Sequence, residues 1–387
     1  MNLKTIIIMW LFASSMTYAQ QLEKAKKKVD SLFQKQLAQK NVHNAFLTVY
    51  SDKLGIDWNY AKGSFKDGTP VTDKTPFHST SVAKTFTATL IMLLQEEGKL
   101  DVGDPLTEYL SSKIIDGLHI FKGVDYSKEI LIKQLLQHTS GLPDFFEDAP
   151  KEGPTFMELL FTGSDKMWQP LETIDFAKSK LTPHFPPGKG YRYSDTEYVL
   201  LGLLIDELTG KPYHEVLAEK IFHPLKMKDS YMHLRSKPSD SGTRQLAEIY
   251  VDDTDISTFK SLSADWAGGG LATTSKDLLK FHKALNEGRL LSKKSLGQMQ
   301  QWTKESFGLD YGFGLRKFQL KKLNPLLGNL TLIGHSGTSG AFMYFCPEID
   351  VYLTGTFNQT AYQRKHVVFM VEVLAQLKNL SKAKKKE

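Results

Sequence analysis

The chain has 387 residues, of which 41% are hydrophobic and 24% are charged, and this balance excludes a fibrous, collagen-like or wholly disordered protein. Part of the formal net charge of +6 comes from lysines in the basic tail, residues 381–387. Because no basic stripe interleaved with aromatic residues occurs elsewhere, we expect no nucleic-acid partner.

Residues 1–19 have the pattern of a secretory signal peptide. Lys4 supplies the positive charge, Ile6 to Phe12 form the apolar run, and Thr17-Tyr18-Ala19 is a small-residue cleavage site before Gln20. A retained membrane anchor would need about 18 apolar residues, and polar residues from Ser14 onward interrupt this run. We therefore expect a periplasmic or secreted protein, cleaved near Gln20, with no stable membrane insertion afterwards.

The next elements are predicted from periodicity and from turn residues. Apolar residues at helical spacing predict a helix over 22–39, and two runs rich in β-branched and aromatic residues, 45–50 and 56–65, predict a hairpin. Helices are expected over 82–97, 128–137 and 198–208. Thr274 and Asp277 resemble a capping box at the start of a further helix that ends at residue 285.

Strands return towards the C-terminus, over 330–333, 341–346 and 351–357, and an amphipathic helix is expected over 365–380. The predicted fold class is therefore α+β, an antiparallel sheet flanked by terminal helices with an inserted, mostly helical lobe. We place the sheet lobe at about 20–75 and 300–380 and the helical lobe at about 76–299. The single cysteine, Cys346, allows no internal disulfide, and its apolar neighbours predict a buried side chain rather than a nucleophile.

A candidate nucleophile stands at the start of the helix predicted over 82–97. Ser81 precedes Lys84 by one helical turn, and a serine needs an adjacent base, which a partly desolvated lysine can supply. The spacing alone is weak, because Ser257 and Lys260 give a second match. The alternative is structural, with Ser81 as a helix N-cap and Lys84 as a solvated first-turn residue.

Two further clusters follow in the sequence, Tyr193-Ser194-Asp195 before a helix and Gly334-His335-Ser336-Gly337-Thr338 at the end of a strand. With Ser81 and Lys84 they occur in the order typical of the serine β-lactamase and penicillin-binding-protein superfamily, which the sequence resembles. The similarity is closest to the class C β-lactamase-related, esterase and D-peptidase branch. It extends over nearly the whole predicted mature chain, including residues 136–142, 224–227, 268–271 and 311–314.

The resemblance implies a β-lactamase/transpeptidase-like fold and assigns roles to these residues. Ser81 would be the acylated nucleophile, Lys84 its base partner, and Tyr193 the phenol that carries a proton to the leaving group. The backbone amides of Ser81 and Thr338 would form the oxyanion hole, and no cofactor would be needed. Tyr193 has a structural alternative as a half-buried aromatic residue ahead of a helix.

The substrate-binding positions implied by the resemblance are Asp195, His335, Ser336 and Gly337, and two of them depart from the β-lactamase pattern. Asp195 replaces an asparagine, so it accepts hydrogen bonds but cannot donate one when ionised, and an N-cap role for the following helix can coexist with a role in the site. His335 replaces a lysine, and a histidine of ordinary pKa is mostly neutral at pH 7 to 8. Both changes predict a preference for neutral esters or amides over anionic β-lactams.

Other polar residues have structural interpretations. His138 follows a helix end, where a structural role is favoured, and the Gly268-Gly269-Gly270 run lacks the residues of a phosphate loop and is expected to let the backbone approach a cleft wall. The scattered histidines form no two-histidine pair with a glutamate, so no metal is implied.

We therefore expect an exported serine hydrolase whose partner is a small-molecule ester, peptide or β-lactam substrate, with esters or D-amino-acid-containing peptides favoured. A β-lactamase or a D-Ala-D-Ala carboxypeptidase is the alternative within the superfamily. A non-catalytic cell-wall or ligand-binding protein with the same fold is the alternative from another class, and the oligomeric state stays open.

Overall fold

The computed structural model describes residues 3–239, 242 and 244–384, with side chains from residue 18 onward apart from residue 383. Its helices are α1 (Leu3–Leu37), α2 (Ala83–Glu96), α3 (Ser112–Ile115), α4 (Ile132–Leu136), α5 (Phe156–Thr162), α6 (Pro170–Lys180), α7 (Asp195–Thr209), α8 (Tyr213–Leu217), α9 (Trp266–Gly269), α10 (Ser275–Asn286), α11 (Lys293–Met299), α12 (Leu320–Leu323) and α13 (Lys365–Lys384). Its strands are β1 (Asn44–Ser51), β2 (Ile56–Gly63), β3 (Phe77–His78), β4 (Ile120–Phe121), β5 (Val124–Asp125), β6 (Tyr231–Met232), β7 (Tyr250–Val251), β8 (Thr254–Asp255), β9 (Leu271–Thr273), β10 (Thr303–Ser306), β11 (Leu309–Tyr311), β12 (Arg316–Gln319), β13 (Thr331–Ser336), β14 (Phe342–Cys346) and β15 (Val351–Thr356).

Strands from both ends of the chain form one antiparallel sheet of eight strands, in the order β10-β11-β12-β13-β14-β15-β1-β2. The predicted hairpin is confirmed, since Asn44 pairs with Gly63 and Ser51 with Ile56. β2 lies at the edge and alternates buried and exposed residues at its start, whereas β1 is buried almost throughout. The central strands are therefore covered on both faces.

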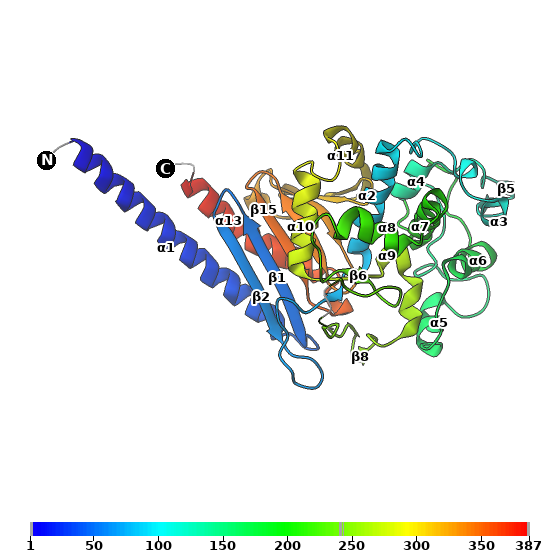
Figure 1. Cartoon of the computed structure of the whole chain (residues 1–387), viewed down its shortest axis with the longest axis horizontal. Coiled ribbons are helices and arrows are strands. Elements are labelled where there is room, and N and C mark those ends of the chain that lie inside the picture. Colours follow the sequence, from blue (N-terminus) through cyan, green and yellow to red (C-terminus); the bar gives the residue numbers. More distant parts are fainter. Residues whose placement is uncertain (1–2, 240–241, 243, 385–387) are drawn as a thin grey trace.

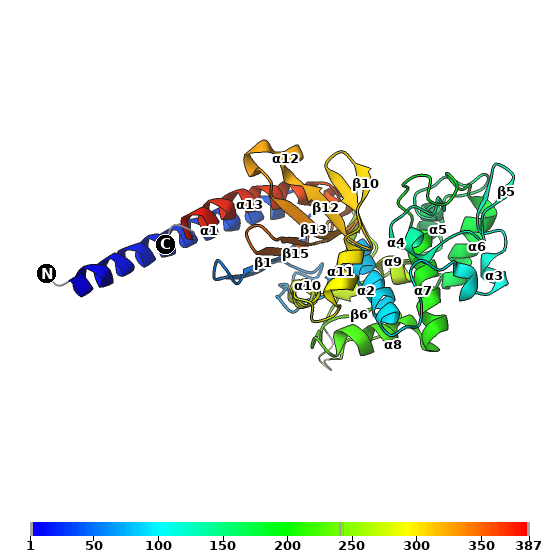
Figure 2. The ribbon, with the colours of Figure 1, turned by 90° about the horizontal axis from the view of Figure 1, so that it is seen from above.

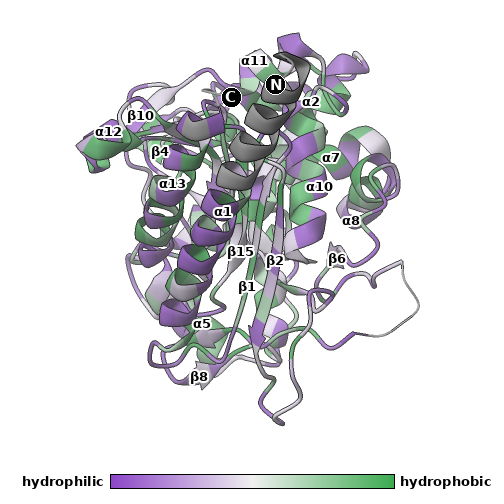
Figure 3. Cartoon of the chain, turned by 90° about the vertical axis from the view of Figure 1, so that its left-hand side faces the viewer, coloured by the Kyte–Doolittle hydropathy of each residue, from purple (hydrophilic) through white to green (hydrophobic). Residues whose placement is uncertain are grey.

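Helices cover both faces of this sheet. α1 and α13 pack against each other on one face, and Figure 2 shows them side by side above the strands. In Figure 3, α1 lies on the near side of the molecule, and its coloured turns are mostly hydrophilic. Val29 and Phe33 of α1 join Leu374 of α13 in the core beneath them. α10 contacts β1, β14 and β15 from the other face.

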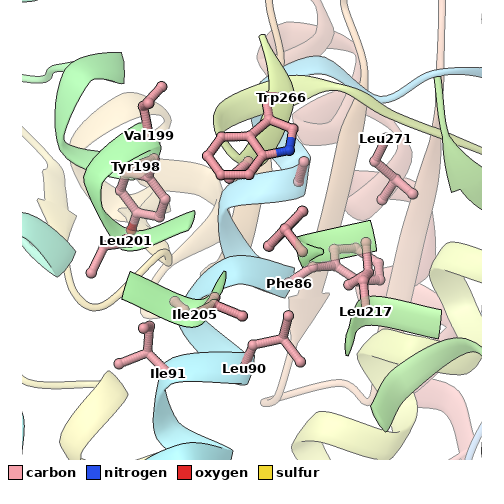
Figure 4. Close-up of a cluster of buried hydrophobic side chains, with 14 of the residues drawn as sticks. Phe86, Leu90, Ile91, Tyr198, Val199, Leu201, Ile205, Leu217, Trp266 and Leu271 are labelled. Atoms are coloured by element: carbon pink, nitrogen blue, oxygen red, sulfur yellow. The ribbon is translucent and has the colours of Figure 1, made fainter. Parts of the chain in front are cut away.

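Helices α3 to α9 and α11 gather beyond that second face, around α2 (Figure 1). Most of α2 is buried, and its Phe86, Leu90 and Ile91 pack in a core that includes Ile205 of α7 (Figure 4). α7 and α9 approach closely because Gly202 has no side chain, and a Cβ there would lie 2.6 Å from the Cβ of Ala267. The antiparallel sheet, the flanking terminal helices and the mostly helical insertion confirm the predicted α+β architecture.

Several predicted boundaries are wrong. The helix expected from residue 22 is α1, which begins at Leu3 and passes without a break through the expected cleavage site. The helix expected over 128–137 is only α4, because Leu131 is extended and bridges Pro105. Thr274 caps α10 by accepting from the amide of Asp277, but the Asp277 carboxylate binds Ser230 and Lys280 instead of completing the box. Among the described residues, no helix combines the length and the apolar character needed to cross a membrane.

Candidate active site

Ser81 lies in a short 3₁₀ turn, Thr80–Val82, that leads directly into α2. Thr80 has a φ of +45°, a left-handed conformation that a non-glycine residue rarely adopts and that is common at functional sites. The turn is held against the end of β13, where a Cβ on Gly337 would lie 1.8 Å from Oγ1 of Thr80. Only glycine allows this approach, and it brings Thr338 to the same cavities as Ser81.

Lys84 is fully buried one turn after Ser81. Its Nζ donates to Oγ of Ser81 at 3.2 Å, to the carbonyl oxygen of Gly268 at 2.9 Å and to the carboxylate of Asp195. An ammonium group has three N–H donors, and these three acceptors use them all. The interpretation of Lys84 as a solvated residue is therefore wrong.

Asp195 is the first residue of α7 and is not its N-cap, a position that Ser194 occupies without a capping hydrogen bond from its side chain. The Asp195 carboxylate lies against the backbone of Gly268, where a Cβ would come within 3.0 Å of Oδ1. The glycine run thus lets the backbone approach the cleft wall, as predicted. Because Lys84 neutralises Asp195, the carboxylate adds no net negative charge to the site.

Tyr193 presents an unused hydroxyl beside Ser81. Within the described part of the chain this buried hydroxyl makes no hydrogen bond. The Nζ of Lys84 and the guanidinium of Arg316 each lie 5.0 Å from the centre of its ring. Burial raises the pKa of Tyr193 well above its usual value and the Asp195 carboxylate adds to the rise, while Arg316 and the nearby Ser81 hydroxyl oppose it. The phenol therefore keeps its proton at neutral pH.

The imidazole ring of His138 packs against the ring of Tyr193, with ring centres 4.2 Å apart. Its φ is +58°, and its Nδ1 bonds to the carboxyl group of Glu197, which also accepts the amide of Ser140 at 3.3 Å. Burial lowers the pKa of His138 and raises that of Glu197, so both are held uncharged. The structural role predicted for His138 is confirmed, and it extends to positioning the phenol.

His335 is not placed where the sequence analysis expected a substrate-binding residue. Its side chain is fully buried and lines neither cavity beside Ser81. Nδ1 faces the carbonyl oxygen of Ser336 at 2.8 Å and must carry the proton, while Nε2 accepts from the hydroxyl of Tyr311 at 2.9 Å. Burial lowers the pKa of His335 well below its usual value, helped by Arg316 and Lys84. The imidazole is a neutral structural group.

Two cavities meet at Ser81, and Asp195 and Thr338 line both. We call the first the apolar cavity; it has a volume of about 320 Å³ and is walled by Phe146, Met157, Leu160, Phe161, Ile249, Val251, Ile256, Phe259 and Leu262, with His78, Glu147, His233 and Asp265 among its polar residues. We call the second the charged cavity; it has a volume of about 460 Å³ and is lined by Tyr193, Glu305, Arg316, Ser336, Gly337 and Arg364. The predicted residues Ser336 and Gly337 therefore lie at the site.

Two carboxyl groups and a cation near Lys84 could not be identified from the sequence. Burial raises the pKa of Asp144 well above its usual value and that of Asp265 to about 7, and the Asp195 charge adds to both shifts. Arg316 is paired with Glu305 through two hydrogen bonds of 3.0 and 2.8 Å. No local pattern marks these residues, because strands and loops far apart in the chain bring them together.

The second Ser-x-x-Lys match does not form a comparable pair. Ser257 bonds to the carboxylate of Asp255, and Lys260 lies 3.5 Å from the carboxylate of Asp165. Among the residues that the structure describes, no group of three histidine, cysteine, aspartate or glutamate side chains is arranged to hold a metal ion. Cys346 is buried and unpaired, as its apolar neighbours predict.

Comparison with known proteins extends these observations. The beta-lactamase family model matches residues 29–375. Penicillin-binding protein 4* from Bacillus subtilis is 26% identical over 329 residues, covering 78% of this chain and 66% of the relative. Teichoic acid D-alanine hydrolase from Staphylococcus aureus is 26% identical over 304 residues, covering 77% of this chain and 67% of the relative. The chain spans about two thirds of the length of these curated relatives.

A solved structure, the D-amino acid amidase from Ochrobactrum anthropi SV3 complexed with L-phenylalanine amide, superposes with a TM-score of 0.75. The two sequences are 26% identical, and the superposition covers 92% of this chain and 99% of the amidase chain. These similarities confirm the predicted β-lactamase/transpeptidase-like fold.

Proposed function

Because the chain belongs to the beta-lactamase family, whose model matches residues 29–375, we propose that it is a serine hydrolase that acts through a covalent acyl-enzyme on Ser81. The observation that carries this proposal is the contact between Nζ of Lys84 and Oγ of Ser81 at 3.2 Å, beside a Tyr193 hydroxyl that is free to donate. A nucleophile within reach of a base and a proton donor is the arrangement that acyl transfer requires.

The first step forms a bond between Oγ of Ser81 and the substrate carbonyl carbon. The Ser81 proton passes to Nζ of Lys84 while one Lys84 proton passes to Asp195, so the pair takes up one proton in total. The amides of Ser81 and Thr338 stabilise the oxyanion. Tyr193 then gives its proton to the leaving group, and the transient phenolate lies near Arg316 and Lys84. The Lys84–Asp195 pair returns the proton that it took from Ser81 to the Tyr193 phenolate. Water repeats the sequence on the acyl-enzyme.

We propose esters or amides of D-amino acids, or peptides that contain them, as the substrates. The names of two relatives, a teichoic acid D-alanine hydrolase and a D-amino acid amidase, support this class. The exposed carboxylate of Glu147, which lines both cavities, is a suitable counter-charge for a substrate ammonium group.

A β-lactamase or D-Ala-D-Ala carboxypeptidase is the second candidate. Arg364 lines the charged cavity, is exposed, and could attract a substrate carboxylate. The similarity to a penicillin-binding protein also favours this candidate.

Mass spectrometry of the intact protein tests these functions together. The protein is treated with a fluorophosphonate, a penicillin or an activated ester, and each sample is compared with Ser81→Ala. We expect a covalent adduct on the unmodified protein with the fluorophosphonate and the ester, and none on the variant. A protein that forms no adduct with any of them and hydrolyses no ester would instead be a non-catalytic binding protein.

We also propose that the protein is exported and cleaved before Gln20. The basic start, the apolar run and the small-residue site at 17–19 support this. Cleavage there would shorten α1 and remove the hydrogen bond from the hydroxyl of Tyr18 to the carbonyl oxygen of Leu54. N-terminal sequencing of the exported protein is the test, and a species that still begins at Met1 would contradict it.

A further inference from the structure

The apolar cavity has the chemistry of a binding pocket for a bulky uncharged group. Met157 and Phe161 of α5 are 39% and 37% exposed, although large apolar side chains are usually buried. Both line this cavity, where Phe161 meets Phe259 edge to face with ring centres 5.8 Å apart. Their exposure leaves apolar surface that a ligand can cover, and covering it is favourable.

The walls of this cavity carry no positive charge at neutral pH. No lysine or arginine is among the described residues that line it. Burial lowers the pKa of His78 well below its usual value and that of His233 to about 4, so both imidazoles are neutral. An anionic group would therefore lose its hydration without gaining a counter-charge.

The two cavities differ in whether Tyr193 lines them. Its side chain lines the charged cavity and does not line the apolar cavity, whereas Ser81 and Thr338 line both. In the proposed mechanism Tyr193 gives its proton to the leaving group, which must then lie within hydrogen-bond reach of it. The leaving group therefore occupies the charged cavity and the acyl group extends into the apolar cavity.

Resting on the proposed function, we propose that the apolar cavity is the acyl-side specificity pocket and that it selects acyl groups with an aromatic or large branched aliphatic side chain. The volume of about 320 Å³ supports this size. A cavity of about 150 Å³ already accommodates benzene. Met157, Phe161, Val251 and Phe259 are the residues that set the preference.

The test uses 4-nitrophenyl acetate and 4-nitrophenyl phenylacetate, which share one leaving group and differ only in the acyl side chain. We expect kcat/KM to be at least about 10-fold higher for the phenylacetate, the smallest effect typical of adding apolar groups in a fitting pocket. Val251→Phe, which adds bulk to a half-buried wall, should lower kcat/KM for the phenylacetate and abolish this preference. Val124→Phe is the matched control, because Val124 is 49% exposed on β5 and lines neither cavity.

A second pair of variants covers the case in which Val251→Phe does not fold. Phe161→Ala removes one exposed wall and should lower kcat/KM for the phenylacetate about 10-fold, whereas Leu326→Ala, at a residue 85% exposed outside both cavities, should not. Equal kcat/KM values for both esters with the unmodified protein would contradict the proposed specificity pocket. An equal effect of Phe161→Ala on both esters would contradict it as well. In either case an adduct on Ser81 would leave the proposed function standing, whereas the absence of turnover and of an adduct would contradict that function itself.

Discussion

Lys84 and Asp195 form an ion pair that is withdrawn from solvent, with side-chain exposures of 0% and 12%. The sequence predicts Asp195 as a substrate-binding residue, and in the structure it is first of all the ion-pair partner of Lys84. A buried pair of opposite charges stabilises each member, and the loss of one leaves an uncompensated charge. The Lys84 ammonium is therefore held in place by the Asp195 carboxylate.

Asp195→Asn should impair catalysis. In the proposed mechanism Asp195 takes up the proton that Lys84 passes on, and an amide oxygen can accept the hydrogen bond from Lys84 but cannot hold that proton. We expect kcat/KM for an activated ester to fall about 100-fold or more. Steady-state kinetics measure this, together with the melting temperature of the variant. An unchanged kcat/KM in a folded variant would show that Asp195 does not take part in the proton transfer.

Ser81→Ala should abolish covalent labelling and lower kcat by several orders of magnitude, because Ser81 is the proposed nucleophile of the acyl-enzyme. Ser257→Ala is its matched control, since Ser257 bonds to Asp255 and has no contact with Lys260 of the kind that joins Ser81 to Lys84. The measurement is active-site titration with an activated ester, together with the melting temperature of each variant. Labelling that persists on a folded Ser81→Ala protein would contradict the assignment.

His335→Lys should destabilise the protein and should not create an anion site. The new ammonium would be buried near Arg316 and Lys84 and would lose the acceptor that Tyr311 uses, which we expect to cost about 3 kcal/mol or more of unfolding free energy. Urea unfolding measures this, and His335→Gln, which keeps an acceptor and a donor, should be milder. A stable lysine variant that is acylated by penicillin faster than the unmodified protein would show that position 335 reaches the cleft after all.

The contrast between His335 and Ser336 shows what sequence patterns can and cannot predict. The strand itself was predicted from its apolar residues, and successive side chains of a strand must point to opposite faces. Which of the two neighbours faces the cleft depends on the register of β13 against β14, where His335 pairs with Met343. That register is a tertiary property, and the motif alone placed both residues at the site.

The spacing of Ser81 and Lys84 was predictable because both lie within one helical turn. Arg316, Asp144 and Asp265 were not, because their places near Lys84 depend on contacts between distant segments. β10 to β12 were missed for a related reason, since Thr303–Ser306 and Arg316–Gln319 are short and rich in charged residues and lack a β-branched run. These strands are held by pairing with their neighbours in the sheet, a contribution that a local pattern does not contain.

Asp265→Asn should change how stability depends on pH. Burial raises the pKa of Asp265 from 3.8 to about 7, so between these values the folded protein keeps a proton that the unfolded chain has lost. The folded state then binds more protons, and the free energy of unfolding falls as the pH rises through this window. An asparagine does not titrate, so the variant should lose less stability than the unmodified protein between pH 4 and 7. Urea unfolding at each pH measures the free energy of unfolding. If both proteins lose the same amount of it between pH 4 and 7, the raised pKa of Asp265 is contradicted.

Gly337→Ala should separate Thr338 from Ser81 and thereby impair catalysis. A Cβ at this position would lie 1.8 Å from Oγ1 of Thr80 and 2.6 Å from the carbonyl oxygen of Ser79, and the backbone oxygen cannot move without displacing the turn that carries Ser81. A displacement of about 1 Å is enough to lower kcat about 100-fold, because both oxyanion amides must reach the same oxygen.

The same variant should also lose about 1 to 3 kcal/mol of unfolding free energy from overpacking. Gly297→Ala is the control, because Gly297 lies within α11 with nothing near its absent Cβ, so alanine there should stabilise the helix by up to about 1 kcal/mol and leave kcat unchanged. Steady-state kinetics and urea unfolding of both variants are the measurements. A Gly337→Ala protein with normal kcat would mean that β13 can withdraw from the turn without moving Thr338, and the proposed oxyanion hole would then need a different second donor.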